Sequence, residues 1–319
     1  MDLALLIIFG ICILLLVSGG YVFIVACHRR ADPDWLDKKQ VDKTPYNIYY
    51  ENILNADRWL KDHAVQEQIM VSHDGLKLFA RWIPAEEPIG TVLFAHGYRS
   101  TILVDFGLIF EYYHSLGFNL LIPDQRCHGK SQGKWITFGV KESKDMLGWV
   151  KYHNERFGTY PVILSGLSMG ASTMLYTADQ DLPENVRGII ADCGFTSPKE
   201  IISSVYKRVI GLPGAITLFL VGIFTKWFAG FALTEKDSRK TLVNSKVPVL
   251  IVHGTDDNFV PCDMSRQAYA ACREPKKLLL VNGAEHGTSF LVDKLDYVRE
   301  VNKLFREYIS PQMNFREEI

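Results

Sequence analysis

The sequence predicts an α/β protein with a mostly parallel central sheet and helices on both faces. Short apolar segments typical of buried strands alternate along the chain with segments whose apolar residues have helical spacing. The helical spacing is clearest at residues 104–116 and 140–157. Because a helix between two strands returns the chain to the edge where the first strand began, such strands pair in parallel. The strand-like segments are residues 90–97, 119–123, 161–165, 186–192, 247–254 and 277–281.

The N-terminal segment, residues 1–30, predicts one transmembrane helix that anchors the chain. From Leu3 to Cys27 there is no charged residue, and this stretch exceeds the roughly 20 residues needed to cross the hydrocarbon layer. A cleaved signal peptide and a lipoprotein signal at residues 24–27 are the alternatives, but no basic residue precedes the stretch. Arg29 and Arg30 follow it, and by the positive-inside rule they place the globular domain on the cytoplasmic side.

The next segment, residues 31–64, predicts a linker with a helix near residues 48–63, and the globular domain is expected to span residues 65–319. The domain opens with two strand-like segments, residues 65–70 and 76–83, separated by a turn that contains Asp74-Gly75. An Asp-Gly pair is a strong hairpin signal because both positions tolerate positive φ. We therefore expect a β-hairpin at the start of the sheet.

The segment Gly166-Leu167-Ser168-Met169-Gly170 follows an apolar strand and precedes a predicted helix. A serine between two glycines at such a sharp turn is the nucleophile elbow pattern. The glycines avoid collisions with neighbouring backbone, and the helix N-terminus favours negative charge that develops nearby. We therefore predict that Ser168 is a nucleophile.

Two later loops carry the groups that would activate this serine. Asp257 follows the strand at residues 247–254, and His286 follows the strand at residues 277–281. A serine hydroxyl is a poor nucleophile until a base removes its proton, and a carboxylate fixes the tautomer of that base. We assign His286 as the base and Asp257 as its partner, with the adjacent Asp256 as the alternative acid.

The tetrahedral intermediate of such a reaction needs donors for its oxyanion. One is expected to be the backbone N–H of Met169, the residue after the nucleophile. The second is expected from the loop after the strand that ends in His96-Gly97, where we assign the N–H of Tyr98. His96 itself is expected to support this loop by packing and hydrogen bonding.

Four motifs together resemble the serine hydrolases of the α/β-hydrolase fold, over about residues 65–310. They are His96-Gly97-Tyr98, the stretch from Asp124 to Ser131, the elbow, and the paired Asp257 and His286 loops. The chain is most similar to bacterial membrane-anchored hydrolases related to the fungal Bem46-like proteins and to the serine aminopeptidase-like group. The resemblance implies a carboxylesterase, lipase, thioesterase or peptidase, and structural roles for Asp124 and Arg126.

Residues 197–233 interrupt the alternation, and residues 212–233 are nearly continuously apolar, with Lys226 as their one charged residue. A second membrane span would separate Ser168 from Asp257 and His286, so two interpretations remain: a buried core helix, or a helical cap over the active site. A cap at this position is typical of the fold that the chain resembles. It would favour hydrophobic acyl substrates, with Phe224, Trp227 and Phe228 lining the pocket.

We expect a serine hydrolase that cleaves small-molecule carboxylic esters with hydrophobic acyl groups through an acyl-enzyme, without metal or cofactor. One alternative is a peptidase or amidase of the aminopeptidase-like group, for which Glu285 is the best candidate to bind a free amino group. Another is a non-catalytic, membrane-tethered binding protein. The 319 residues carry a net charge of −1, which gives no case for nucleic-acid binding. No obligate protein partner is evident, and six scattered cysteines suit a reducing compartment.

Overall fold

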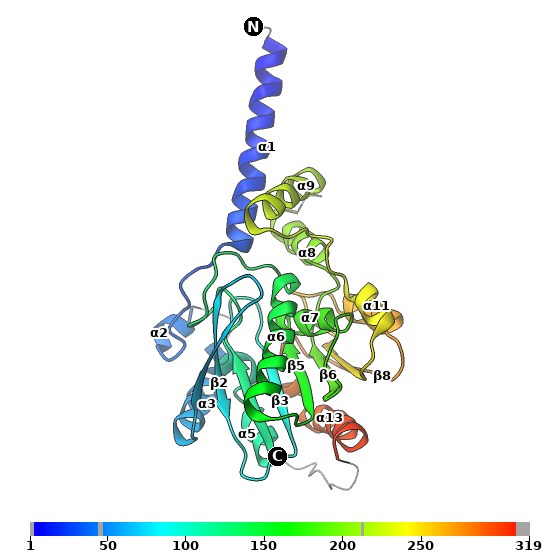
Figure 1. The fold of residues 1–319 in the computed structure, drawn as a ribbon. Coiled ribbons are helices and arrows are strands. Elements are labelled where there is room, and N and C mark those ends of the chain that lie inside the picture. The colour runs from blue at the N-terminus through cyan, green and yellow to red at the C-terminus, as the bar shows by residue number, and fades with distance from the viewer. Residues whose placement is uncertain (1–2, 44–46, 212–213, 311–319) are drawn as a thin grey trace.

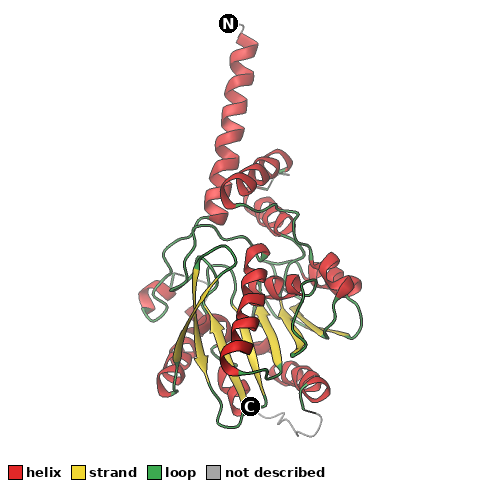
Figure 2. Ribbon diagram, viewed as in Figure 1, coloured by secondary structure: helices red, strands yellow, loops and turns green. Residues whose placement is uncertain are grey.

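The computed structural model describes residues 3–43, 47–211 and 214–310. The chain folds into one central sheet with helices on both faces, and one long helix projects away from it (Figures 1 and 2). The strands are β1 (Gln66–Val71), β2 (Lys77–Ile83), β3 (Gly90–Ala95), β4 (Phe118–Pro123), β5 (Val162–Leu167), β6 (Val186–Asp192), β7 (Val249–Gly254) and β8 (Lys276–Val281). Their order in the sheet is β1-β2-β4-β3-β5-β6-β7-β8.

The sheet is mostly parallel, as the alternation of segments predicts. Strand β2 pairs antiparallel with β1 and β4, and the remaining neighbours pair in parallel. The β1–β2 pair is the predicted hairpin: its turn is closed by a hydrogen bond from the Gly75 N–H to the Ser72 carbonyl (3.0 Å), with Gly75 at φ 87°. Every residue of β3, β4 and β7 is buried, which explains their nearly continuous apolar sequences.

Some of the helices cover the two faces of the sheet, and others lie outside these layers. They are α1 (Leu3–Cys27), α2 (Lys38–Val41), η1 (Asn47–Tyr49), α3 (Tyr50–Asp62), α4 (Ile102–Phe106), α5 (Phe110–Ser115), α6 (Val140–Phe157), α7 (Met169–Thr177), α8 (Pro198–Ile210), α9 (Ala215–Phe224), the π-helical turn η2 (Thr225–Ala229), α10 (Ser238–Thr241), η3 (Leu242–Asn244), α11 (Cys262–Ala271), α12 (Ser289–Val292) and α13 (Lys294–Tyr308).

Two hydrophobic clusters, one on each face, show how the layers pack. Helices α6, α7 and α11 pack on one face through residues such as Trp149 and Met174. Helices α4, α5 and α13 pack on the other through residues such as Phe110 and Phe305. Alternate residues of a strand enter opposite clusters: Leu93 belongs to the first, and Val92 and Phe94 belong to the second.

The described residues between 197 and 233 include α8, α9 and η2, which lie beyond the end of the sheet from which α1 emerges (Figure 1). Ser197 caps α8, because its hydroxyl accepts a hydrogen bond from the Glu200 N–H and Pro198 follows it. Helix α9 packs along α1, and a Cβ placed on Gly19 would lie only 2.6 Å from the Leu220 Cβ. The glycine therefore permits a close approach of these two helices.

Helix α1 is long and apolar enough to cross a membrane, with a mean hydropathy of 2.8 over its most apolar window. Residues 3–17 make few contacts with the rest of the chain, whereas the C-terminal part of the helix is packed against it. Phe23 and Cys27 are buried in a cluster that includes residues of α8, α9 and η2. The far end of α1 is therefore exposed, and the near end belongs to the folded domain.

Candidate active site

The elbow between β5 and α7 has the strained geometry that its sequence predicts. Ser168 lies at φ 56° and ψ −116°, a conformation that residues with side chains rarely adopt. A Cβ on Gly166 would lie 2.3 Å from the Gly170 carbonyl oxygen, and a Cβ on Gly170 would lie 1.8 Å from the Ala95 oxygen. Only glycine fits at either position, and the turn projects the serine at the carboxyl end of β5.

The structure brings Ser168, His286 and Asp257 together from three separate loops. The Ser168 Oγ lies 2.9 Å from the His286 Nε2, and the His286 Nδ1 lies 2.6 Å from the Asp257 Oδ2. Because an ionised carboxylate only accepts hydrogen bonds, the His286 Nδ1 must carry the proton. The Nε2 is then free to accept the hydroxyl proton of the serine. The neighbouring Asp256 is exposed and does not contact His286.

Asp257 is held as an anion by more groups than the sequence indicates. Its Oδ1 accepts hydrogen bonds from the backbone N–H groups of Phe259 and Val260, both at 2.8 Å. Its Oδ2 lies 3.2 Å from the Nε2 of the buried His253. Burial alone would raise the pKa of Asp257, but hydrogen bonds from His253 and His286 hold that pKa well below its ordinary value. The carboxylate is therefore ionised whenever the protein is folded near neutral pH.

His253 is a site residue that the sequence analysis missed. It lies on β7 inside an apolar run, and its Nδ1 lies 2.6 Å from the Ser265 Oγ. Its Nε2 lies 3.0 Å from the Val260 carbonyl oxygen, an obligate acceptor, so this nitrogen carries the proton and also faces Asp257. The available signal was its place four residues before Asp257 at the end of a strand.

The predicted oxyanion donors lie on the two segments beside Ser168. A Cβ placed on Gly97 would be 3.4 Å from the Ser168 Cβ, so the loop after β3 adjoins the nucleophile. The Gly97 N–H donates to the Oδ2 of the half-buried Asp105 at 2.5 Å. Within the described residues, the N–H groups of Tyr98 and Met169 donate to no protein acceptor. They are therefore the available donors at this position.

Two further residues hold the loop that carries Tyr98. Asp105, missed in the sequence, also accepts a hydrogen bond from the Ser100 hydroxyl at 2.6 Å. Burial raises the pKa of Asp105, although the bonds from Gly97 and Ser100 oppose that effect. His96 contacts the Gly97 carbonyl through its Nδ1 (2.9 Å) and accepts the Gln125 N–H through its Nε2 (3.0 Å), which is the supporting role expected for it.

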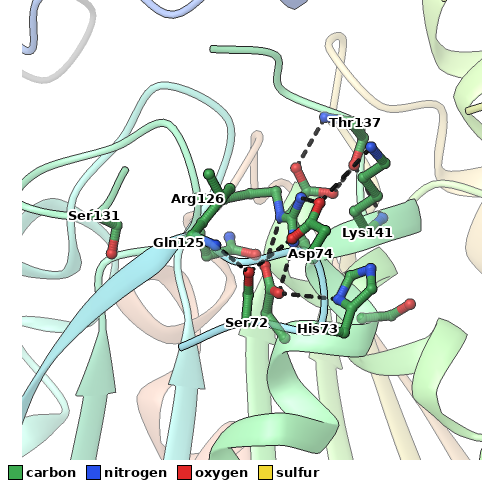
Figure 3. A network of polar contacts seen from close by, with 12 residues as sticks. Ser72, His73, Asp74, Gln125, Arg126, Ser131, Thr137 and Lys141 are labelled. Carbon is green, nitrogen blue, oxygen red and sulfur yellow. Dashed lines mark hydrogen bonds and ion pairs between the residues drawn. The ribbon is translucent and has the colours of Figure 1, made fainter. Parts of the chain in front are cut away.

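The loop after β4 is braced by ion pairs, in agreement with the structural role that the resemblance implies (Figure 3). Arg126 lies between two carboxylates, bonded through its Nε to Asp145 at 2.6 Å and through its Nη1 to Asp74 at 2.9 Å. Asp124 pairs with Arg81 at 3.0 Å. These contacts join the β1–β2 turn, the β4 loop and α6 without contacting Ser168.

Two cavities meet at Ser168. The first, here called the polar pocket, has a volume of about 360 Å³ and is lined by His286, Asp256, Glu285 and Arg208 among others. The second, here called the α1–α8 groove, has a volume of about 460 Å³. Its walls are almost entirely apolar and are formed by Ser18, Tyr21, Val22, Val25 and Ala26 of α1, by Ile201, Ile202, Val205, Tyr206, Val209 and Ile210 of α8, and by Tyr98, Arg99, Phe138, Ser168, Phe195 and Phe259.

The pocket residues predicted in the cap need correction. Phe224, Trp227 and Phe228 line neither cavity. Phe224 and Phe228 stack against Phe23 of α1, and Trp227 is 81% exposed. The sequence identified the apolar insertion but not its orientation. The pocket-facing side chains come from α8, and the contribution of α1 was not anticipated.

Two groups of side chains bring potential metal ligands together among the described residues. His73, Asp74 and Asp145 form the first group, and the Arg126 guanidinium already pairs with both of its carboxylates. Cys193, Asp257 and His286 form the other group. Burial raises the pKa of the Cys193 thiol well above its ordinary value, so this thiol is neutral and a poor metal ligand.

Comparisons with known proteins relate the chain to hydrolases and to the α/β-hydrolase fold. Residues 86–218 match the model of the serine aminopeptidase S33 family. The chain is 28% identical over 224 residues to the uncharacterized protein YqkD of Bacillus subtilis, covering 69% of this chain and 72% of YqkD. It is 24% identical over 201 residues to the lysophosphatidylserine lipase ABHD12 of Danio rerio, covering 59% of this chain and 48% of that protein.

The fold agrees with a solved esterase of Pyrococcus furiosus, with a TM-score of 0.63 and 21% identity over 78% of this chain and 92% of the esterase. At that identity the likeness concerns the fold. The chain is therefore a hydrolase of the α/β-hydrolase fold, and over residues 86–218 it is similar to the serine aminopeptidase family.

Proposed function

We propose that the chain is a membrane-anchored serine hydrolase that cleaves carboxylic esters with hydrophobic acyl groups through an acyl-enzyme. The observation that carries this proposal is the continuous relay from the Ser168 Oγ to the His286 Nε2 and from the His286 Nδ1 to the Asp257 Oδ2. A relay of this kind is the arrangement that makes a serine hydroxyl nucleophilic at neutral pH.

In the first half-reaction, the Ser168 Oγ attacks the ester carbonyl carbon as its proton passes to the His286 Nε2. The carbonyl oxygen becomes an oxyanion that accepts hydrogen bonds from the N–H groups of Tyr98 and Met169. The intermediate then expels the alcohol, which takes the proton from the His286 Nε2. Water repeats these steps on the acyl-serine and releases the carboxylic acid. Asp257 holds the imidazole and stabilises its charged form throughout.

This reaction scheme suggests which cavity takes the alcohol portion of the ester and which takes the acyl group. Because His286 must give its proton to the departing oxygen, the alcohol lies on the side of the histidine. The polar pocket includes His286 and the α1–α8 groove does not, although both include Ser168. The polar pocket therefore takes the alcohol, and the apolar groove takes the acyl group.

The same assignment favours an esterase over an aminopeptidase. An aminopeptidase substrate carries a free amino group on the acyl side of the scissile bond, where a carboxylate should bind it. Among the described residues that line the α1–α8 groove there is no Asp or Glu, and its one charged residue is Arg99. Glu285 and Asp256 line the polar pocket, on the alcohol side. The similarity to a lysophosphatidylserine lipase also supports an amphiphilic ester.

We also propose that α1 is retained as a single-pass anchor with the catalytic domain on the cytoplasmic side. The packing of Phe23 and Cys27 in the domain core supports retention, because cleavage after α1 would expose that cluster. Arg29 and Arg30 support the orientation. Arg29 is also bound to the domain, since its guanidinium donates to the carbonyl groups of Ser131 (2.6 Å) and Gly129 (2.7 Å).

Labelling and turnover test the catalytic proposal. Full-length protein in lipid vesicles should be labelled by a fluorophosphonate probe and should hydrolyse p-nitrophenyl butyrate. The S168A variant should lose both, and the S204A variant on α8 should retain both. Faster turnover of aminoacyl-p-nitroanilides than of the ester would favour the peptidase alternative. A folded wild-type protein that shows neither labelling nor turnover would instead indicate a binding protein.

A further inference from the structure

The α1–α8 groove has an unusual wall, because one side of it is the apolar N-terminal helix. Val22 and Val25 of α1 face the groove together with Val205 and Val209 of α8, and Ser168 lies on its lining. An acyl chain that extends from the Ser168 Oγ through this groove must therefore run along α1. This inference rests on the proposed function, and it concerns the source from which the acyl chain of the substrate enters the groove.

The wall is rigidly joined to the catalytic loop. The Tyr98 hydroxyl donates to the Ala26 carbonyl at 2.8 Å. The Arg99 Nη2 donates to the Val25 carbonyl at 2.7 Å and to the His28 carbonyl at 3.1 Å. These carbonyl groups belong to the C-terminal end of α1 and the residue after it, where they lack intrahelical partners. The loop that holds the predicted oxyanion donor thus fixes the position of α1.

The length of α1 places the groove at the membrane. Residues 3–17, which extend beyond the domain, span roughly 22 Å at about 1.5 Å per residue, less than the ~30 Å hydrocarbon layer. The rest of that layer must then surround residues 18–23, where α9 packs against α1 and where the groove begins. The mouth of the groove therefore lies at the level of the acyl chains of one leaflet.

The surface around the mouth is apolar in a pattern that fits this depth. Ile216, Phe219, Ile223 and Trp227 recur at helical spacing along α9 and η2, and all are exposed, Phe219 at 69%. Val209 and Ile210, at the end of α8 beside the groove, are also exposed. Lys226 is the single charge in residues 212–233, and its long stem can carry the ammonium to the headgroups.

We propose that the α1–α8 groove takes up the long acyl chain of a lipid ester directly from the bilayer, with α1 as one wall of the binding site. The ester group reaches Ser168 at the inner end of the groove, and the alcohol portion enters the polar pocket. Under this proposal the N-terminal helix binds substrate as well as anchoring the chain.

Chain-length selectivity tests the wall. Full-length V22W, which fills the groove from α1, is compared with I24W, whose exposed position on the same helix lies outside the groove. The measured quantity is the ratio of kcat/KM for p-nitrophenyl palmitate to that for p-nitrophenyl butyrate, in vesicles of ether-linked phosphatidylcholine. We expect this ratio to fall about tenfold in V22W and to stay within about twofold in I24W.

V205W fills the groove from α8 and should lower the ratio in the same way, which preserves the test if V22W does not fold. Equal ratios in the groove variants and I24W would overturn the proposal. Absence of butyrate turnover and fluorophosphonate labelling in the wild type would instead remove the proposed function, so the two failures are distinguishable.

The accessibility of introduced thiols tests whether the acyl chain of the substrate enters the groove from the bilayer. In vesicles, a V209C variant at the mouth should react slowly with a membrane-impermeant maleimide, and a V243C variant on η3 should react rapidly. The two valines are both exposed, at 70% and 52%, so the lipid is expected to make the difference. Mass spectrometry of the labelled peptides separates these sites from the native cysteines. Equal labelling rates would place the mouth in water and overturn uptake from the bilayer.

Discussion

Replacing Asp257 with asparagine tests the proton relay at a single atom. The Oδ1 of Asp257 accepts two backbone N–H groups, from Phe259 and Val260, both at 2.8 Å. In the D257N variant the amide oxygen must take that place, because an NH₂ group there would face two donors. The amide nitrogen is then forced to the Oδ2 position, 2.6 Å from the His286 Nδ1. It donates to that nitrogen and leaves the proton of the imidazole on Nε2.

A protonated Nε2 cannot accept the Ser168 proton, so the wrong tautomer blocks the first step. We expect kcat for p-nitrophenyl butyrate to fall about 10⁴-fold, which corresponds to roughly 5 kcal/mol in the barrier. The assay is initial-rate kinetics on full-length protein in vesicles, with circular dichroism to verify folding. D256N is the matched control: its carboxylate is exposed and bonded to Thr255, so its kcat should stay within about twofold. A folded D257N variant with kcat within tenfold of wild type would refute this reasoning.

Substitutions at Gly170, Asp192 and Tyr98 test three other parts of the structure. The G170A substitution should lower the unfolding free energy by at least about 3 kcal/mol and give little folded protein, because its Cβ would lie 1.8 Å from the Ala95 oxygen. The control G222A, whose Cβ would lie 3.9 Å from its nearest neighbour, should fold normally. Equal yields of folded protein for the two variants would contradict this prediction. Burial raises the pKa of Asp192 to about 6, against an ordinary value of ~4. The folded state therefore binds this proton more tightly than the unfolded state does. The unfolding free energy should consequently fall as the pH rises from about 4 to about 6. D192N should make this slope shallower in denaturant titrations between pH 4 and 7, and an unchanged slope would show that Asp192 does not contribute to it. Y98F should lower the unfolding free energy by about 1 kcal/mol, because it removes the hydrogen bond to the Ala26 carbonyl. Y160F, at an exposed position, is the control. Equal melting curves for the two variants would contradict this prediction.

The parts of the fold that depend on local patterns were predictable from the sequence. The hairpin at β1 and β2, the alternation that builds the parallel sheet, and the elbow at Ser168 each follow from a few neighbouring residues. Residues 104–116 show where this approach fails. Their spacing predicts one helix, but the chain forms two short helices, α4 and α5. Between them Gly107 lies so close to α3 that a Cβ there would be 2.4 Å from the Ala56 Cβ, a tertiary contact that the local spacing does not indicate.

The candidate site was predictable only where a motif marks a residue. Ser168, Asp257 and His286 have recognisable loop contexts, and the structure brings their side chains within hydrogen-bonding distance. Asp105 lies in a segment with the pattern of an ordinary helix, and His253 lies in one with the pattern of a buried strand, where its place four residues before Asp257 is a weak signal. Their importance comes from the atoms they face, which belong to other loops.

By itself the sequence determined the class of fold, an N-terminal helix long enough to span a membrane, and the residue types of a serine hydrolase. Local preference and hydrophobic periodicity are written in neighbouring residues, so these features can be read without coordinates. The tertiary structure alone decided which apolar side chains line the α1–α8 groove. It turned Phe224, Trp227 and Phe228 away from Ser168 and placed Val22 and Val25 of α1 in the groove. The reason is physical: the sequence of an apolar helix does not specify which segment it packs against. Its partner is determined only when segments that are distant in the sequence pack together around the same space.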